Sequence, residues 1–143
     1  MSGSAIADGF KTLLSATSVL GSGNVSINSY QVLESSACAC AVIQWTRLAS
    51  TPVAFGSPRA RDRLWDFQIR AFIRDTGDPL TALNRVWTAT NTIMTAIEDD
   101  DTVQGTCEVL NNIVAIRDPE TAMTFGGHTW LPITITATVT EFV

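Results

Sequence analysis

The chain contains little charge, and basic residues are especially scarce. Asp, Glu, Lys and Arg make up 16% of the 143 residues, whereas about 25% is typical of a globular protein. Nine residues are Lys or Arg and 14 are Asp or Glu, which gives a net charge of -5. Non-specific nucleic-acid binding usually requires a basic face, so the composition argues against that function. An acidic surface would suit a wall past which DNA moves, and it is equally ordinary in a soluble protein.

Long apolar runs are also missing. No stretch approaches the roughly 18 residues that a membrane-spanning helix requires. The opening MSGSAIADGF lacks the basic cluster and the apolar segment of a secretory signal. We therefore expect a cytoplasmic chain that keeps its cysteines reduced and has no membrane partner.

The single histidine limits the catalytic mechanisms open to the protein. Any His-dependent acid–base or nucleophilic step would have to use His128, which follows Gly126 and Gly127 in a segment typical of a turn. The chain also lacks a nucleophile elbow, a phosphate-binding loop and a dinucleotide-binding fingerprint. We predict that it is not an enzyme and carries no cofactor.

The three cysteines raise the question of a metal site. Cys38 and Cys40 would face the same side of a strand, and Cys107 and His128 could complete a set of four zinc ligands. A convincing zinc sequence has two closely spaced pairs, and this one has a single pair. Cysteine is also a common core residue. We predict core cysteines and no metal, with a metal- or small-molecule-binding module as the alternative.

Periodicity divides most of the chain into two helices and four strands. Apolar residues at helical spacing predict helices over 4–16 and 79–97, the second begun by Asp78 as its cap and by Pro79. Alternating or β-branched patterns predict strands over 37–49, 65–74, 107–117 and 130–143. Residues 25–36 stay undecided between a strand and an extended connection.

The order helix, strand, strand, helix, strand, strand predicts a single α+β domain over residues 1–143. Two hairpins flanking a helix favour a four-stranded, mainly antiparallel sheet with both helices packed on one face. Residues 107–117 mix apolar side chains on both faces, which is typical of a central strand. Residues 130–143 carry threonines on one face, which would suit solvent, or a partner if the strand lies near a sheet edge.

Two charged segments are candidate partner-binding sites. The predicted loop 50–63 is longer than most hairpin connections, and its candidate contact residues are Phe55, Arg59, Arg61 and Arg63. The second segment lies at a predicted helix C-terminus, where negative charge opposes the helix dipole, and consists of Glu98, Asp99, Asp100 and Asp101. It could hold a divalent ion, line a pore or face a partner. A solvated loop and a solvated helix end remain the simpler interpretations.

Taken together, these segments resemble the tail terminator, or tail completion, proteins of long-tailed bacteriophages. The resemblance is carried by the helix from Ile6 to Leu14, the strand from Trp65 to Phe72, the capped helix from Asp78 to Ile97 and the ending from Ile133 to Phe142. It covers most of the chain and concerns the order and texture of the elements rather than an invariant motif. The strand with Cys38 and Cys40 and the stretch 25–36 correspond to no element of that family.

The resemblance implies a structural virion protein, assembled in the host cytoplasm and located in the tail or neck. Members of the family form hexameric rings that cap the finished tail tube, stop its polymerisation and provide the head–tail joining surface. The implied partners are further copies of the chain, a tail tube protein and a head-proximal connector or neck protein, with DNA passing through the lumen without specific binding. The loop 50–63 would reach neighbouring proteins. Another neck or connector ring protein of the virion is the alternative.

Overall fold

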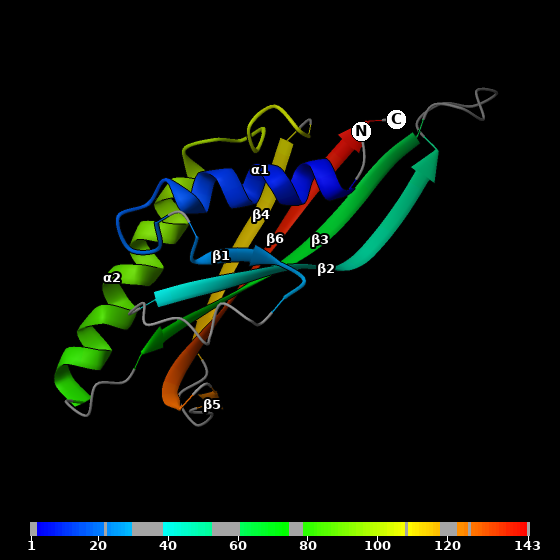
Figure 1. Cartoon of the computed structure of the whole chain (residues 1–143). Helices are drawn as coiled ribbons and strands as arrows, with labels where there is room; N and C mark the ends of the chain where they lie inside the picture. The colour runs from blue at the N-terminus through cyan, green and yellow to red at the C-terminus, as the bar shows by residue number, and fades with distance from the viewer. Residues whose placement is uncertain are drawn as a thin grey trace.

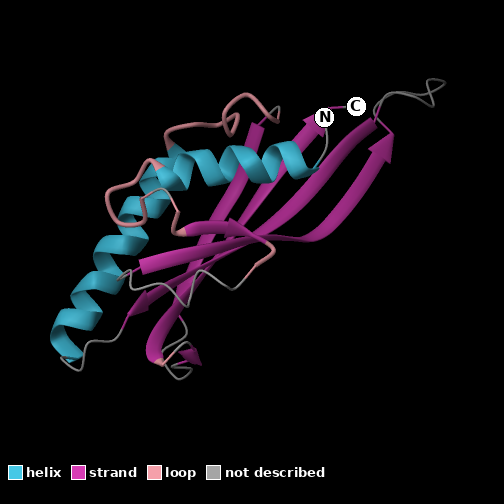
Figure 2. Ribbon diagram, viewed as in Figure 1, coloured by secondary structure: helices cyan, strands magenta, loops and turns pink. Residues whose placement is uncertain are grey.

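Two helices lie against one face of a twisted sheet (Figures 1 and 2). The computed structural model describes residues 3–21, 23–29, 39–52, 61–74, 79–107, 109–117, 123–125 and 127–142. The helices are α1 (Gly3–Ser15) and α2 (Pro79–Glu98). Within the described ranges, no helix is both long and apolar enough to cross a membrane. The fold is α+β, as the sequence predicts.

The sheet is built around a long antiparallel hairpin. Its strands are β1 (Val25–Ile27), β2 (Ala39–Pro52), β3 (Arg61–Arg74), β4 (Val109–Arg117), β5 (Met123–Phe125) and β6 (His128–Phe142). The order across the sheet is β1-β2-β3-β6-β4, and β5 pairs with the beginning of β6. β1 runs parallel to β2, whereas every other pairing is antiparallel. The far end of the β2–β3 hairpin reaches past the N-terminus of α1 (Figure 1).

The predicted four-stranded sheet is too small, because β1 and β5 are also present. β1 accounts for part of the undecided stretch 25–36 and makes the sheet mixed. The predicted position of one strand is also wrong. The segment expected to be central is the edge strand β4, and the threonine-bearing strand β6 lies between β3 and β4. The cause is that β4 carries apolar residues on its exposed face, so its sequence resembles that of a doubly covered strand.

The core lies between the sheet and the two helices. Alternation along β3 and β6 directs every second side chain toward the helices, including Phe67, Ile69, Ile133 and Ile135. These side chains pack with apolar residues spaced at helical intervals: Ile6, Phe10 and Leu14 of α1, and Val86, Ala89, Ile93 and Ile97 of α2. The helices are thereby fixed to the sheet, but Leu83 and Trp87, which belong to the apolar stripe predicted for the second helix, are exposed.

One close approach ties α1 to the turn that follows α2. A Cβ atom at Gly9 would lie 2.4 Å from the carbonyl oxygen of Val103, closer than real atoms approach. Val103 is itself fully buried in the core and adopts a positive φ of 48°. The helix can therefore reach this turn only because residue 9 has no side chain.

Candidate assembly surfaces

The large apolar side chains that remain exposed in the described residues fall into two groups, one on α2 and β4 and one on the β2–β3 hairpin. The groups approach each other at Leu64 and Val109, which both lie beside Thr140 on the sheet face away from the helices. The first group, called here the β4-side surface, comprises Leu83 and Trp87 of α2 and Val109, Val114 and Ile116 of β4. The second group, called the arm surface, comprises Trp45, Leu48 and Leu64 of the β2–β3 hairpin. Exposed fractions reach 70% for Trp87, 59% for Ile116 and 57% for Trp45. Exposed apolar patches on soluble proteins commonly mark contact sites.

The β4-side surface has apolar side chains on both faces of an edge strand. On the helix face, Trp87 and Ala115 line a pocket of about 250 Å³ between α2 and the sheet. On the other face, Val114 and Ile116 lie opposite threonines of β6 and point away from the helices. No strand in the described part of the chain pairs with the outer side of β4. This edge is thus both apolar and free to extend the sheet.

The arm surface is held in shape by contacts between strands. The ring of Trp45 meets that of Trp65 edge to face, with centroids 5.8 Å apart. An Arg47 guanidinium nitrogen lies 4.0 Å from the carboxylate of Asp66, which also accepts a hydrogen bond of 2.8 Å from Thr138 Oγ1. These contacts between neighbouring strands stabilise the arm in the same pairing as the rest of the sheet.

The predicted loop 50–63 is wrong in extent, because β2 continues to Pro52 and β3 begins at Arg61. Arg61 and Arg63 are therefore strand residues. Arg61 Nε donates a hydrogen bond of 2.8 Å to Ser50 Oγ, and an Arg63 nitrogen lies 3.9 Å from the buried carboxylate of Glu141. The other two candidates, Phe55 and Arg59, lie outside the described residues. Both faces of this hairpin are partly in solvent, so charged residues are tolerated on either face. The sequence therefore lacks the alternation of apolar and polar residues by which a strand is predicted.

The acidic run divides into one structural residue and three exposed ones. The carboxylate of Asp100 accepts hydrogen bonds from the backbone N–H groups of Thr102 and Gln104, at 3.1 and 3.0 Å, and from both of their side chains. The bond from the Gln104 backbone contributes most to lowering the pKa of Asp100. Asp100 therefore closes the turn after α2. Glu98, Asp99 and Asp101 are exposed and remain available to a partner.

The threonines of β6 lie on the sheet face away from the helices, beside the exposed apolar side chains of β4. Thr134, Thr136, Thr138 and Thr140 are each half-buried, and they lie opposite Arg70, Gln68, Asp66 and Leu64 of β3. Because β6 is central, these threonines cannot offer a strand edge to a partner. They remain compatible with solvent or with a face-on contact.

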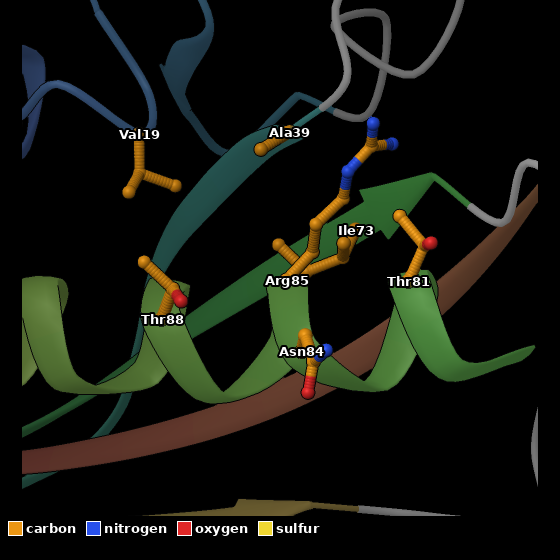
Figure 3. A pocket seen from close by; sticks show the side chains of 7 residues that line it. All are labelled: Val19, Ala39, Ile73, Thr81, Asn84, Arg85 and Thr88. Carbon is orange, nitrogen blue, oxygen red and sulfur yellow. The ribbon is translucent and has the colours of Figure 1, made fainter.

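A separate pocket of about 370 Å³ lies beside the N-terminal half of α2 (Figure 3). Its lining is Val19, Ala39, Ile73, Thr81, Asn84, Arg85 and Thr88. Arg85 rises from α2 toward the beginning of β2 (Figure 3), and its Nη1 is buried with no hydrogen-bond partner among the described residues. The guanidinium of Arg85, beside the apolar side chains of Val19, Ala39 and Ile73, could bind a small acidic group.

The residues of the alternative zinc site are not brought together. Cys40 lies on the face of β2 that points away from the core cluster, whereas Cys107 belongs to that cluster. His128 is the first residue of β6 rather than part of a turn, and its ring lies 6.2 Å from that of Trp130. Across the described ranges, no three His, Cys, Asp or Glu side chains form a group able to hold a metal, and Cys38 lies outside those ranges. Burial raises the pKa of Cys40 to about 12, so its thiol stays protonated.

No family model and no curated protein sequence matches the chain. We therefore infer the function from the two apolar surfaces and from the elements between them.

Proposed function

We propose that this chain is a structural subunit of a bacteriophage particle that assembles with copies of itself into a ring, caps the tail tube and offers a surface for joining the head. One observation chiefly supports this function: in the described residues, exposed large apolar side chains lie both on the β2–β3 hairpin and on the β4 side of the sheet. Neither surface contains an arrangement of catalytic groups.

Two different surfaces favour a ring over a simple dimer. A two-fold dimer requires one patch that is complementary to itself. Contact between one surface on a first copy and the other surface on a second copy is head-to-tail, and such contacts close into a ring when the rotation between copies allows it. The β4-side surface and the arm surface are our candidates for the two sides of such a head-to-tail contact.

The virion role depends on the resemblance to tail terminator proteins. All four segments that carry this resemblance correspond to long elements of the fold, namely α1, β3, α2 and β6. The scarcity of Lys and Arg suits a lumen through which DNA passes without being held. A different neck or connector ring protein is the alternative in the same particle. In either case Phe55 and Arg59, between the two strands of the arm, are candidates for contact with a neighbouring protein.

Two measurements test this function. Light scattering and negative-stain imaging should give an assembly with a central hole, and a monomer at high concentration would contradict the proposal. Purified assemblies should then bind the ends of tail tubes and stop tube growth. Binding to the portal side of the head instead would identify the connector alternative.

A second candidate function, binding of a small acidic ligand, is favoured by the buried Nη1 of Arg85 in the 370 Å³ pocket. Calorimetric titration with short carboxylates and with inorganic phosphate tests it. Saturable binding that the variant Arg85→Ala loses would support this candidate, and no detectable heat with either probe would exclude it.

A further inference from the structure

The sheet ends in a free strand edge on each side. β1 covers β2 only over Ala41–Ile43, and from Trp45 to Pro52 no other strand in the described ranges pairs with the outer side of β2. On the opposite side, the first part of β4 is occupied, because Leu110 N–H donates a hydrogen bond of 2.6 Å to the carbonyl oxygen of Asp101. From Asn112 to Arg117, no strand in the described ranges pairs with the outer side of β4. We call these two segments the arm edge (45–52) and the β4 edge (112–117).

The two edges run in opposite directions. β2 is antiparallel to β3, β3 to β6, and β6 to β4, so three reversals leave β4 antiparallel to β2. If the next copy is placed beside the first with its helices on the same side, its arm edge therefore faces the β4 edge in antiparallel orientation. This is the geometry of an ordinary antiparallel strand pair.

We propose that the β4 edge of one copy pairs with the arm edge of the next, so that the sheet continues from subunit to subunit around the assembly. This inference rests on the proposed ring and specifies its subunit contact. Unpaired edges are the natural sites for strand addition, and proteins that stay monomeric usually protect them with charge, proline or a covering element. Here the β4 edge carries four apolar residues, Ile113–Ile116, between Asn112 and Arg117, whereas the arm edge includes Arg47, Pro52 and a register shift at Thr46.

Side-chain alternation restricts the register of this contact. Leu48 lies opposite the core residue Trp65 and so faces the helix side, whereas Ala49 lies opposite Leu64 and faces the open side. On β4, Ala115 faces the helices and Val114 the open side. A slip by one residue would put helix-side residues against open-side residues, so only registers that differ by two residues are allowed.

One allowed register pairs the whole β4 edge with residues 46–51 of the arm edge. Val114 of one copy then lies opposite Ala49 of the next, and Ala115 lies opposite Leu48. Ala115 of one copy would then cover the exposed Leu48 of the next. Ile116 of the first copy would lie against the aliphatic part of Arg47 of the next. The contact would thereby remove exposed apolar area from both surfaces at once.

The charges at the end of this contact are complementary. In the same register the beginning of β4 lies beside Pro52 of the next copy, and Pro52 pairs with Arg61. The exposed residue Asp101 is held next to Leu110 at the beginning of β4. A carboxylate of one copy is thus brought toward a guanidinium of the next, which favours this orientation over its reverse.

Disulfide trapping between copies tests the contact. The single variants Val114→Cys and Ala49→Cys are mixed, oxidised and separated without reductant, and directly opposite residues of an antiparallel pair are close enough for a disulfide. We expect a band at twice the chain mass that reductant removes. The matched control replaces Ala49→Cys by Leu48→Cys, which faces the other side and should give no band above that of the single variants. Cys40 is buried with a raised pKa, so it should contribute little background.

The outcomes separate this inference from the proposed function. Trapping with Arg47→Cys or Thr51→Cys in place of Ala49→Cys would support the edge contact and move its register by two residues. A ring in which none of these open-side pairs is trapped would overturn the edge contact and leave the proposed ring standing. If wild-type protein and all variants are monomeric, both proposals fail.

Discussion

Trp45 and Trp65 meet edge to face on neighbouring strands, with ring centroids 5.8 Å apart and planes inclined at 87°. Trp65 is buried beneath the start of α1, where a Cβ atom at Gly3 would lie 2.6 Å from its ring. Trp45 is more than half exposed on the arm surface. The contact between the two rings therefore links the core to the arm surface. Packing of Trp65 in the core orients Trp45, which is available for contact with a neighbouring subunit.

Replacing Trp45 by alanine is expected to weaken self-association more than folding. Loss of the aromatic contact should cost about 1 kcal/mol of unfolding free energy. A tryptophan covered at an interface typically contributes about 2 kcal/mol or more to binding, and Trp45 adjoins the end of the proposed strand contact. Urea unfolding and sedimentation measure the two quantities. Equal losses in both would show that Trp45 serves the fold alone.

A charge at the β4 edge should prevent assembly. The variant Ile116→Lys puts an ammonium group in the proposed strand contact, and lysine is a common protection against edge pairing. Thr95→Lys is the matched control, because Thr95 is also exposed but lies on α2 and belongs to neither of the two assembly surfaces. Light scattering should find Ile116→Lys monomeric and the control assembled. Full assembly of Ile116→Lys would contradict the edge contact.

Exchange of two charges should reveal the orientation of neighbouring copies. Arg61→Glu and Asp101→Arg each place like charges together in the proposed contact, so each should weaken assembly, by about 0.5–1 kcal/mol for an exposed pair. The double variant restores opposite charges and should recover part of that loss. Sedimentation at low and high salt measures it, because salt screens exposed charges. If the double variant loses the sum of the two single losses in assembly free energy, the two residues are not in contact between copies.

Asp100 should make the turn after α2 sensitive to acid. Its pKa in the folded chain lies below the ordinary value of 3.8, so its contribution to stability is fully present above that value and is lost as the pH falls through the lowered pKa. Asp100→Asn should lower the unfolding free energy near neutral pH and remove this acid-dependent part. Asp101→Asn is the control, because that side chain makes none of the four turn bonds. Urea midpoints measured from neutral to acidic pH test the difference.

The variant Gly9→Ala tests the packing of α1 on the same turn. Alanine normally stabilises a helix interior by roughly 0.5–1 kcal/mol relative to glycine. Here the added Cβ would meet the Val103 carbonyl oxygen, so we expect a loss of about 1–3 kcal/mol, as in other overpacked cores. The sign of the change, measured by urea unfolding, therefore decides whether the close approach is present in solution.

Long, regular segments of this fold are readable from the sequence because their side chains alternate or repeat over many residues. The helix α2 and the strand β6 begin and end within about two residues of the predicted positions, an ordinary margin for element boundaries. The strand β1 has three residues, too few to establish a period. Its pairing with β2 is set by tertiary contacts.

The candidate surfaces were harder to predict, because exposure depends on strand order. Val114 and Ile116 are apolar and are typical of a covered strand, and only the order of the sheet shows that they lie at its edge. Arg61 and Arg63 resemble loop residues, yet they belong to a paired arm. Asp100 could be singled out as part of an acidic run, but its four hydrogen bonds require the turn geometry. Residue type indicates which groups are unusual, and topology decides what they can contact.

The mass of the purified chain in solution tests the central claim most directly. A subunit with two complementary edges should form a closed assembly whose mass is a whole multiple of 15.4 kDa and which shows a central hole in negative stain. Light scattering over a range of concentrations measures that mass. A uniform particle of 15.4 kDa at the highest concentration would contradict the account.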